Sequence, residues 1–341
     1  MGFIQAAILG IGAGAVYVLI AQGIVLIYRG AGTLNFAQGA VAMVTAHVFF
    51  EFRDRYGSPA AVAFPVAVAL AGLFGVVLYL LVLRPLRRSS ALVRLVATLG
   101  LLTLLMGVAQ WVWGEARAVQ GILPIHPIRI GDSLVFPANR LYLLVISVVV
   151  TVVLAAVYQR SRFGLATAGA SENELVAITL GWSPARLGAV NWFVGCALAG
   201  GAGILLTSVT GLSIRTLALT VVPGMATALV GRFSSFGWTL LGGLGLGVGQ
   251  SLAVRYINEP GMADVVTFGV ITVLVVAGGR AVPLRGEFLE RPVRVGSGRF
   301  PLVAVAALAA GAFGVVLLAS NEWLLALSTS APSPSMRCGA Q

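Results

Sequence analysis

The sequence predicts an all-α fold, a bundle of helices that crosses a lipid bilayer many times. Two observations support this prediction: the composition and the recurrence of long uncharged runs. Hydrophobic residues make up 59% of the 341 residues and charged residues only 10%. With a mean hydropathy of +0.99, the chain carries more apolar surface than one soluble core of this size could bury, so lipid must cover the excess.

The uncharged runs are long enough to cross a membrane as helices. About 20 residues suffice, because a helix rises about 1.5 Å per residue and the hydrocarbon core is about 30 Å thick. In order, the runs are 3–28, 30–50, 58–83, 95–114, 141–159, 187–212, 216–231, 233–254, 265–279 and 301–320. We therefore expect about eight to ten membrane segments, with candidate broken or re-entrant helices near 30–39 and 231–237.

Arginine is distributed unequally between the loops. All 22 basic residues are arginine, and they form short clusters between the uncharged runs. If the loops alternate sides from the cluster at 84–88, one side of the membrane holds 14 arginines and the other seven. The positive-inside rule then places the richer side in the cytoplasm and the N-terminus outside. This arrangement indicates contact with anionic lipid headgroups rather than with nucleic acid.

The residue types also limit the chemistry of the chain. Because there is no lysine, the chain has no phosphate-binding loop of the G-x-x-x-x-G-K-[ST] type and no lysine Schiff base, so any ATP must be bound by another chain. His47 and His126 are too few for a metal cluster. His47 is the titratable candidate within the spans, and helix packing or a place at the interface explains it. We expect no enzyme activity, metal or cofactor in this chain.

The shortage of titratable groups within the spans separates the classes of transport protein. Self-sufficient secondary carriers usually place Asp, Glu, His or Arg in the membrane to hold the coupling ion. A membrane enzyme would need a base or metal ligands beside its nucleophile. The sequence therefore favours a passive translocation subunit. The alternative is a self-sufficient carrier or channel for small polar solutes such as urea or amides.

Two polar breaks interrupt the apolar sequence. Residues 32–39 place Asn35 and Gln38 within one helical turn, followed by Gly39. These side chains either line a substrate path or brace a broken helix, or they hold neighbouring helices together. The second break, at 231–237, lies between two short or interrupted segments, and its candidate pathway residues are Thr227, Ser234 and Ser235. Interrupted helices in both halves of the chain predict a central site.

Two glycine clusters, 10–14 and 242–249, lie inside apolar spans. As strings they are similar to dinucleotide-binding fingerprints, but no strand and helix context surrounds them. Small residues four positions apart instead let two membrane helices approach closely. We therefore expect both clusters to be helix-packing contacts.

The loop 160–186, on the predicted cytoplasmic side, is the most informative polar stretch. Ser171 and Glu174 read as a capping box, Gly181 is placed to end the helix, and Pro184 prevents its continuation. The predicted helix, 172–180, is about 14 Å long and cannot span. Its candidate docking residues are Glu172, Asn173, Leu175, Ile178, Leu180 and Gly181. Such a helix either docks on a peripheral ATPase or rests on the lipid headgroups.

The loop 115–140 is the only long one on the predicted external side. Three prolines and alternating isoleucines at 122, 128 and 130 predict an extended or hairpin segment. It would either cap the helix ends or meet a soluble partner.

Several of these stretches together resemble one transporter family. They are 17–23, 34–39, 83–90, 161–164, 172–181 and 226–231, and they occur in order over about residues 3–292. The chain resembles the Liv-type (LivH-like) permeases of bacterial branched-chain amino acid ABC importers. The resemblance implies a bacterial plasma-membrane subunit that pairs with a second permease, two cytoplasmic ATPases and an extracytoplasmic substrate-binding protein. The helix at 172–180 would then be the coupling helix.

The chain departs from the family pattern at two places. Related chains tend to carry a basic residue before the coupling helix, whereas residues 164–170 here contain none. The second break often reads Gly-Gly-x-Gly-Ser, whereas residues 231–235 here read Gly-Arg-Phe-Ser-Ser. We expect the first difference to remove one ion pair with the ATPase and the second to alter the pathway or the cargo.

The resemblance also divides the chain into parts. Residues 1–292 correspond to the permease domain, 293–300 to a cytoplasmic linker, and 301–320 to an extra membrane helix that is similar to the opening of the sister permease. The polar, proline-rich residues 321–341 read as a disordered tail. We expect residues 301–341 to be either a truncated fusion with a second permease or a functional extra segment. The sequence leaves open the cargo and whether the permease pair is a homodimer or a heterodimer.

Overall fold

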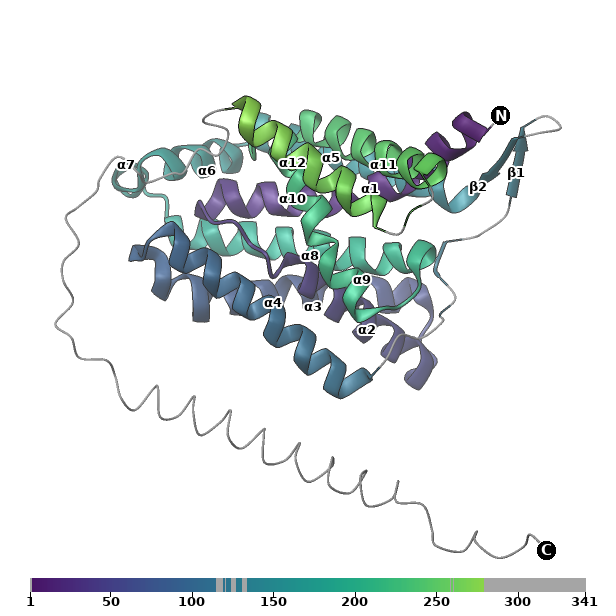
Figure 1. Ribbon diagram of the computed structural model, residues 1–341. Coiled ribbons are helices and arrows are strands. Elements are labelled where there is room, and N and C mark those ends of the chain that lie inside the picture. The colour runs from purple at the N-terminus through teal and green to yellow at the C-terminus, as the bar shows by residue number, and fades with distance from the viewer. Residues whose placement is uncertain are drawn as a thin grey trace, which may run out of the picture. The chain divides into compact units, whose positions relative to one another are not determined.

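The computed structural model describes residues 2–114, 119, 121–123, 127–130, 134–257, 259 and 261–278, and most of these residues are helical (Figure 1). The helices are α1 (Gly2–Ala31), α2 (Gln38–Tyr56), α3 (Ala60–Leu78), α4 (Ala91–Trp113), α5 (Ala138–Arg160), α6 (Arg162–Glu172), α7 (Glu174–Thr179), α8 (Pro184–Thr210), α9 (Ile214–Leu219), α10 (Val221–Val230), α11 (Phe236–Ile257) and α12 (Met262–Gly278), with a π-helical turn η1 (Tyr79–Leu83) and a 3-10 turn η2 (Pro85–Arg88). The predicted helical bundle is confirmed. The predicted linker, extra helix and tail at 293–341 lie outside the described residues.

Six helices of the described part are long and apolar enough to cross a membrane: α1, α3 continued by η1, α4, α5, α8 and α11. Two shorter apolar stretches are Ile214–Val230, which covers α9 and α10, and Met262–Val276, which covers most of α12. Helix α2 is 19 residues long, but its last turns carry two acidic and two basic residues. Each of the nine spans predicted before residue 280 therefore coincides with a helix or an interrupted helix.

Helix α1 lies at the centre of the bundle. It packs along its length against α8 and α11 and also contacts α5 and α10. In Figure 1, α2, α3 and α4 lie below α1, on the same side of it as α8. Helices α5, α11 and α12 lie above α1, on the opposite side. The side chains of Ile20, Ile24 and Leu26 on α1 are fully buried, as expected for a central helix surrounded by protein rather than lipid.

Glycines bring α1 and α11 into backbone contact. A Cβ added at Gly10 would lie 2.5 Å from the carbonyl oxygen of Gly247, and one added at Gly14 would lie 2.5 Å from that of Gly243. No side chain fits at such distances, so only glycine allows this approach. The predicted helix-packing role of the two glycine clusters is confirmed for these four residues.

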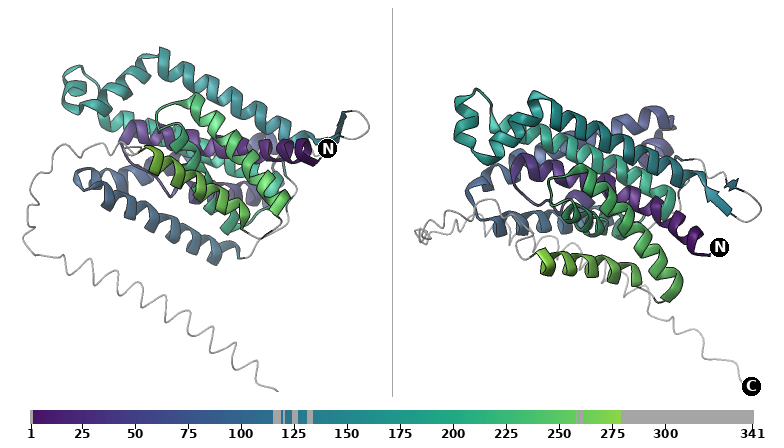
Figure 2. Two further views of the ribbon diagram at one scale, coloured as in Figure 1. Left: turned by 45° about the horizontal axis from the view of Figure 1, so that its top comes forward. Right: turned by 90° about the horizontal axis from the view of Figure 1, so that it is seen from above.

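The bundle has two ends that are distinguished by their loops. At one end, Arg29 of α1 reaches the turn between α10 and α11, and Tyr158 of α5 bonds to Asn191 of α8. At the other, Ser251 of α11 donates to the carbonyl oxygen of Ala6. We call these the Arg29 end and the hairpin end. Figures 1 and 2 place α6 and α7 at the Arg29 end and the β-hairpin at the other, beside the N-terminus. Which end faces the cytoplasm stays a prediction.

The hairpin consists of β1 (Pro127–Ile130) and β2 (Leu134–Pro137), which pair antiparallel from Pro127 opposite Pro137 to Ile130 opposite Leu134. It stands in the long loop for which the sequence predicted an extended or hairpin segment, and that prediction is confirmed.

The segment between α5 and α8 differs from its prediction at the start. The sequence predicted one helix at 172–180, whereas α6 runs through Glu172, Asn173 breaks the helix with an extended backbone, and α7 begins at Glu174. Ser171 lies inside α6 and donates to the carbonyl oxygen of Ala168 at 2.6 Å. The predicted capping box is therefore wrong, because its serine hydroxyl bonds backwards within the preceding helix.

The predicted end of the same segment is confirmed. Gly181 follows α7 with a φ of 82°, the left-handed conformation that favours glycine after a helix. Its N–H donates to the carbonyl oxygen of Ile178, and the N–H of Trp182 donates to that of Ala177. Helix α8 then begins at Pro184.

Candidate functional site

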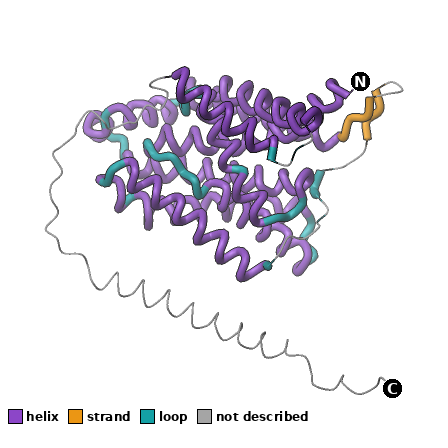
Figure 3. Tube along the Cα trace, viewed as in Figure 1, coloured by secondary structure: helices purple, strands orange, loops and turns teal. Residues whose placement is uncertain are grey.

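The first polar break is a non-helical segment that runs between the helices of the bundle. Residues 32–37 join α1 to α2 without helical structure and appear as a teal loop in Figure 3. Asn35 is therefore not in a helical turn, which corrects that part of the prediction, while the predicted break itself is confirmed. Asn35 and Ala37 are fully buried, and the backbone N–H of Phe36 donates to Oγ1 of Thr98 on α4 at 3.3 Å.

The two predicted amides form a chain of hydrogen bonds. Asn35 Oδ1 accepts from the N–H of Ala37 at 3.0 Å, and its Nδ2 donates to Oε1 of Gln38 at 3.1 Å. Nε2 of Gln38 donates to the carbonyl oxygen of Gly195 on α8 at 2.7 Å. In this conformation the amides brace the break and join the start of α2 to α8, which satisfies polar groups that have no access to water.

Gly39 places the start of α2 against a second interruption. A Cβ added at Gly39 would overlap the carbonyl oxygen of Ala218 and lie 3.0 Å from Cβ of Val221. These two residues flank Thr220, where α9 ends and α10 begins. The helix breaks there because Pro223 has no N–H to donate to the carbonyl four residues earlier.

The two interruptions lie deep within the bundle. Gly195, the partner of Gln38, follows Pro184 at the start of α8 by 11 residues, which is about 17 Å of helix. A Cβ added at Gly23 would lie 2.5 Å from Nε2 of Gln38, and Gly23 precedes Ala31 at the end of α1 by eight residues, or about 12 Å. The start of α2 and the α9–α10 break therefore meet about 12–17 Å from the Arg29-side ends of α1 and α8, a distance that corresponds to about half of a hydrocarbon core about 30 Å thick.

The other predicted pathway residues lie along α10 and the turn that follows it. Thr227 is fully buried, and its methyl group lies against Gly243 of α11, where an added Cβ would be 2.8 Å away. Its hydroxyl oxygen has no hydrogen-bond partner among the described residues. Ser234 and Ser235 lie in the turn between α10 and α11, at the Arg29 end. Of the six predicted pathway residues, three therefore lie where α2 meets the α9–α10 break, and the other three lie further along α10 and in the turn after it.

The turn 231–235 has an unusual backbone. Arg232 and Phe233 have φ values of 50° and 51°, a region that residues other than glycine rarely adopt. Their N–H groups donate to the carbonyl oxygens of Leu229 and Ala228 and so end α10. Val230, Gly231, Arg232, Ser234, Ser235 and Trp238 line a hollow on the surface here. The predicted break at 231–237 is confirmed.

Four polar residues that the sequence reasoning did not single out connect this turn to α5 and α8. Nε2 of Gln22, on α1, donates to Oγ1 of Thr151 at 3.0 Å and to the carbonyl oxygen of Phe236 at 3.1 Å. The other three are Arg29, Tyr158 and Asn191. An amide within an apolar span was a visible signal for Gln22 and for Asn191. Arg29 is one of the 14 arginines on the predicted cytoplasmic side, where the sequence predicts only a charge that sets topology.

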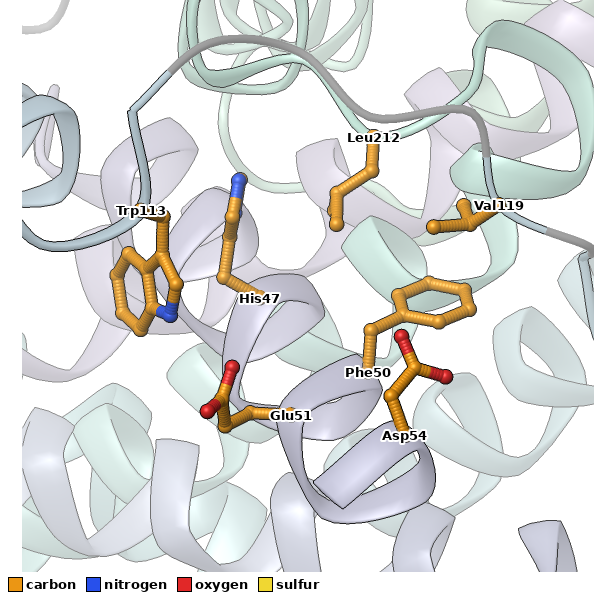
Figure 4. Close-up of a pocket in the computed structure, with 7 residues that line it drawn as sticks. All are labelled: His47, Phe50, Glu51, Asp54, Trp113, Val119 and Leu212. Carbon is orange, nitrogen blue, oxygen red and sulfur yellow. The ribbon is translucent and has the colours of Figure 1, made fainter.

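A small pocket lies at the hairpin end of α2 (Figure 4). His47, Phe50, Glu51, Asp54, Trp113, Val119 and Leu212 line it, and its enclosed volume of about 20 Å³ is enough for about one water molecule. Nδ1 of His47 bonds the carbonyl oxygen of Met43 at 2.8 Å, and its ring packs on Trp113 with 5.0 Å between centroids. His47 thus contributes to the packing of α2 against the end of α4.

The candidate coupling segment presents apolar side chains at the Arg29 end. Ile178 is 54% exposed, Leu180 72% and Trp182 39%. Ala177, on the opposite side of the segment, is buried in a cluster that also contains Ala166, Ala170 and Leu187. The segment therefore rests on α6 and α8 and leaves an apolar surface uncovered by the described residues.

Comparison with known families assigns the chain. The profile of the branched-chain amino acid transport system permease component matches residues 7–276, which include both interruptions, the turn and α6–α7. The chain belongs to this family. As a member of the branched-chain amino acid permease family, it is a multi-pass membrane protein and a transport permease subunit.

Individual relatives carry the same description. The high-affinity branched-chain amino acid transport system permease protein LivH of Salmonella typhimurium is 26% identical over 282 residues, which cover 79% of this chain and 91% of LivH. BraD of Pseudomonas aeruginosa, with the same descriptive name, is 25% identical over 283 residues, which cover 79% of this chain and 92% of BraD. The probable branched-chain amino acid transport permease protein LivH of Methanocaldococcus jannaschii is 26% identical over 264 residues, which cover 76% of this chain and 84% of that LivH. No solved structure matches the chain.

Proposed function

We propose that this chain is the membrane permease subunit of an ATP-driven importer that moves branched-chain or related amino acids into the cell. Partner subunits hydrolyse the ATP, a second permease completes the membrane part, and an extracytoplasmic protein delivers the substrate. The Arg29 end faces the cytoplasm and the N-terminus lies outside. The single observation that carries this proposal is the family match over 7–276, which includes every element that the mechanism below uses.

The meeting point of α2 with the α9–α10 break is the proposed centre of the substrate path. Transporters place substrates near the middle of the membrane between interrupted helices, whose free backbone groups bind the polar ends of the cargo. Here Asn35 and Gln38 brace one interruption, and Gly39 brings it against the other. In the described conformation the amides bond to the protein, so passage of a substrate requires α2, α8 and α9 to separate locally.

The segment 172–181, which contains α7, is the proposed contact with the ATPase. It is too short to span, it lies at the arginine-rich end, and Ile178 and Leu180 are exposed on it. An exposed apolar surface of this kind usually marks a protein or membrane contact. Glu172, Asn173, Leu175 and Gly181 complete the proposed docking segment. Its cluster with Leu187 connects it to the first turn of α8. Further along the same helix, the carbonyl oxygen of Gly195 accepts the hydrogen bond from Gln38.

The test replaces Ile178 and Leu180 together with Asp in a complex reconstituted with ATPase and binding-protein subunits. We expect ATP-dependent uptake of radiolabelled leucine, isoleucine or valine into liposomes to fall at least about tenfold, because charged residues are excluded from the desolvated centre of an interface. The variant should still insert in the membrane. Leu165→Asp, at a 67% exposed position of α6, is the matched control and should transport normally.

The same liposomes separate the proposed importer from a self-sufficient carrier or channel. The purified chain alone should take up no amino acid, urea or amide, with or without an ion gradient. Uptake by the chain alone would reject the subunit role, and unchanged uptake by the double Asp variant would reject docking through α7.

A further inference from the structure

Arg29, in the last turn of α1, is held between two aromatic rings. Its guanidinium carbon lies 5.4 Å from the ring centroid of Tyr158 and 5.3 Å from that of Phe236, within the range of cation–π attraction. One guanidinium nitrogen donates to the carbonyl oxygen of Ser234 at 3.3 Å. An arginine that only added positive charge to one side of the membrane would need none of these contacts.

The same tyrosine connects Arg29 to α8. The hydroxyl of Tyr158 donates to Oδ1 of Asn191, and Nδ2 of Asn191 donates to the carbonyl oxygen of Leu187 at 2.7 Å. Asn191 is fully buried, and a Cβ added at Gly30 would lie 2.6 Å from its side chain. The end of α1, the end of α5 and the start of α8 are therefore fixed to one another at one point.

Helices α5 and α8 are the two that flank α6–α7 in the chain, so this point receives any displacement of that segment. Phe163 of α6 packs on Tyr158 with 5.7 Å between ring centroids. Leu187, whose carbonyl accepts from Asn191, is buried with Ala177 of α7. Tyr158 is thus coupled to the segment through α6 on one side and through Asn191 and α8 on the other.

On its other side, Arg29 holds a turn that needs support. Arg232 and Phe233 have positive φ values, and residues in such conformations persist only where the surroundings determine them. The ring of Phe233 packs on Tyr28 with 5.1 Å between centroids, and Arg29 bonds the next residue, Ser234. Consecutive residues of α1 therefore hold consecutive residues of the turn.

We propose that Arg29 is a positioning residue that links the α6–α7 segment to the α10–α11 turn through Tyr158 and Asn191. A shift of α6–α7 moves Tyr158 and with it the guanidinium of Arg29. The hydrogen bond from the guanidinium to the carbonyl oxygen of Ser234 is thereby broken or strengthened. The turn ends α10, the helix that begins at the meeting point with α2. Only the second of the two experiments below rests on the proposed function, because there the ATPase supplies the shift.

The first experiment measures hydrogen–deuterium exchange of the purified full-length chain in nanodiscs. Arg29→Lys keeps the positive charge but removes the planar, forked guanidinium that stacks on both rings. We expect the amides of residues 231–236 to exchange about tenfold faster, because local opening of the turn becomes easier. Arg160→Lys, at an exposed arginine of the same end, should exchange like the wild type. If residues 231–236 of Arg29→Lys exchange at the wild-type rate, the proposal is overturned and positive charge is the only role left for Arg29.

The second experiment counts the substrate molecules transported per ATP hydrolysed in the complete complex. Arg29→Lys should lower this ratio at least about fivefold, the lower limit of common couplings between distant sites. Tyr158→Phe keeps the ring and removes the hydroxyl, and it should also lower the ratio. The double variant should be no worse than Arg29→Lys alone, because both changes interrupt one path. A wild-type ratio in Arg29→Lys would contradict the link between α6–α7 and the turn. So would a double variant in which the decreases caused by the two single changes multiply.

A wild-type complex that transports no branched-chain amino acid would reject the proposed function, and the exchange experiment would still decide the role of Arg29.

Discussion

The two polar breaks of this permease are held in opposite ways. Residues 32–37 lie inside the bundle, where Asn35 and Gln38 bond to one another and to α8, and where Gly39 packs directly on the backbone of α9. The turn 231–235 lies at one end, with Arg232 and Ser234 exposed and two residues at positive φ. The inner break is fixed by close packing and buried hydrogen bonds, and the outer one by a cation and a ring from α1.

This difference indicates what each break can do. A buried break with satisfied amides opens only when whole helices separate, because a lost hydrogen bond inside the membrane has no water to replace it. A strained turn at the surface changes conformation when a single contact is released. The inner break is therefore suited to shape a path and the outer turn to respond to a signal.

Gly39→Ala is expected to have the largest effect on the stability of the permease. The added methyl group overlaps the carbonyl oxygen of Ala218, so α2 and α9 must move apart at a cost of about 3 kcal/mol, the upper part of the range for overpacked cores. The fraction of monodisperse protein after heating in detergent would show this loss. Gly100→Ala, on α4 where no described residue lies within 4 Å of the added group, should be neutral or stabilising.

Equal heat resistance of the Gly39→Ala and Gly100→Ala proteins would mean that the inner break is not held by close packing, and the comparison would fail.

Gln38→Leu should have a smaller effect on the same break. It leaves the carbonyl oxygen of Gly195 and the amide nitrogen of Asn35 without their partner, and an unsatisfied buried polar group costs about 1–3 kcal/mol. We expect a lower apparent melting temperature in detergent. Gln110→Leu, at an exposed position of α4, is the control, and a similar decrease in both proteins would contradict the role of Gln38 in joining α2 to α8.

Arg232→Gly should have the smallest effect and the opposite sign. Glycine adopts the φ of 50° at this position without the penalty of about 1–2 kcal/mol that other residues incur in the left-handed region. We expect a slightly higher apparent melting temperature. Arg186→Gly, in the first turn of α8, should lower it, because glycine disfavours a helix. A decrease in both proteins would show that the Arg232 side chain stabilises the turn.

The sequence predicted the features that depend on local pattern. Apolar runs located the helices because each membrane helix must be long and uncharged whatever its neighbours are. Gly181 and Pro184 marked the end of α7 and the start of α8, because only their own backbone preferences were needed. The four glycines of α1 and α11 were recognised as packing residues from their spacing alone.

Features that depend on distant residues could not be read in this way. Gln22 and Thr151 are 129 residues apart, and nothing near either residue indicates the other. Helix α6 was missed because its alanines, glycines and threonine give no strong hydrophobic period. Arg29 had an adequate local explanation in the positive-inside rule, so no local pattern predicted two rings and a carbonyl around it.

The backbone contact between α1 and α11 bears on how this permease can vary. Gly10, Gly14, Gly243 and Gly247 contribute no side chain, yet an added methyl group at Gly10, Gly14 or Gly247 would meet the backbone of the facing helix, and one at Gly243 would meet the side chains of Val18 and Thr227. In a saturation mutagenesis of the chain, the least tolerant stripe on these helices should therefore fall on residues that form no side-chain contact at all. Tolerated substitutions in α1 should therefore fall on the faces on either side of that stripe.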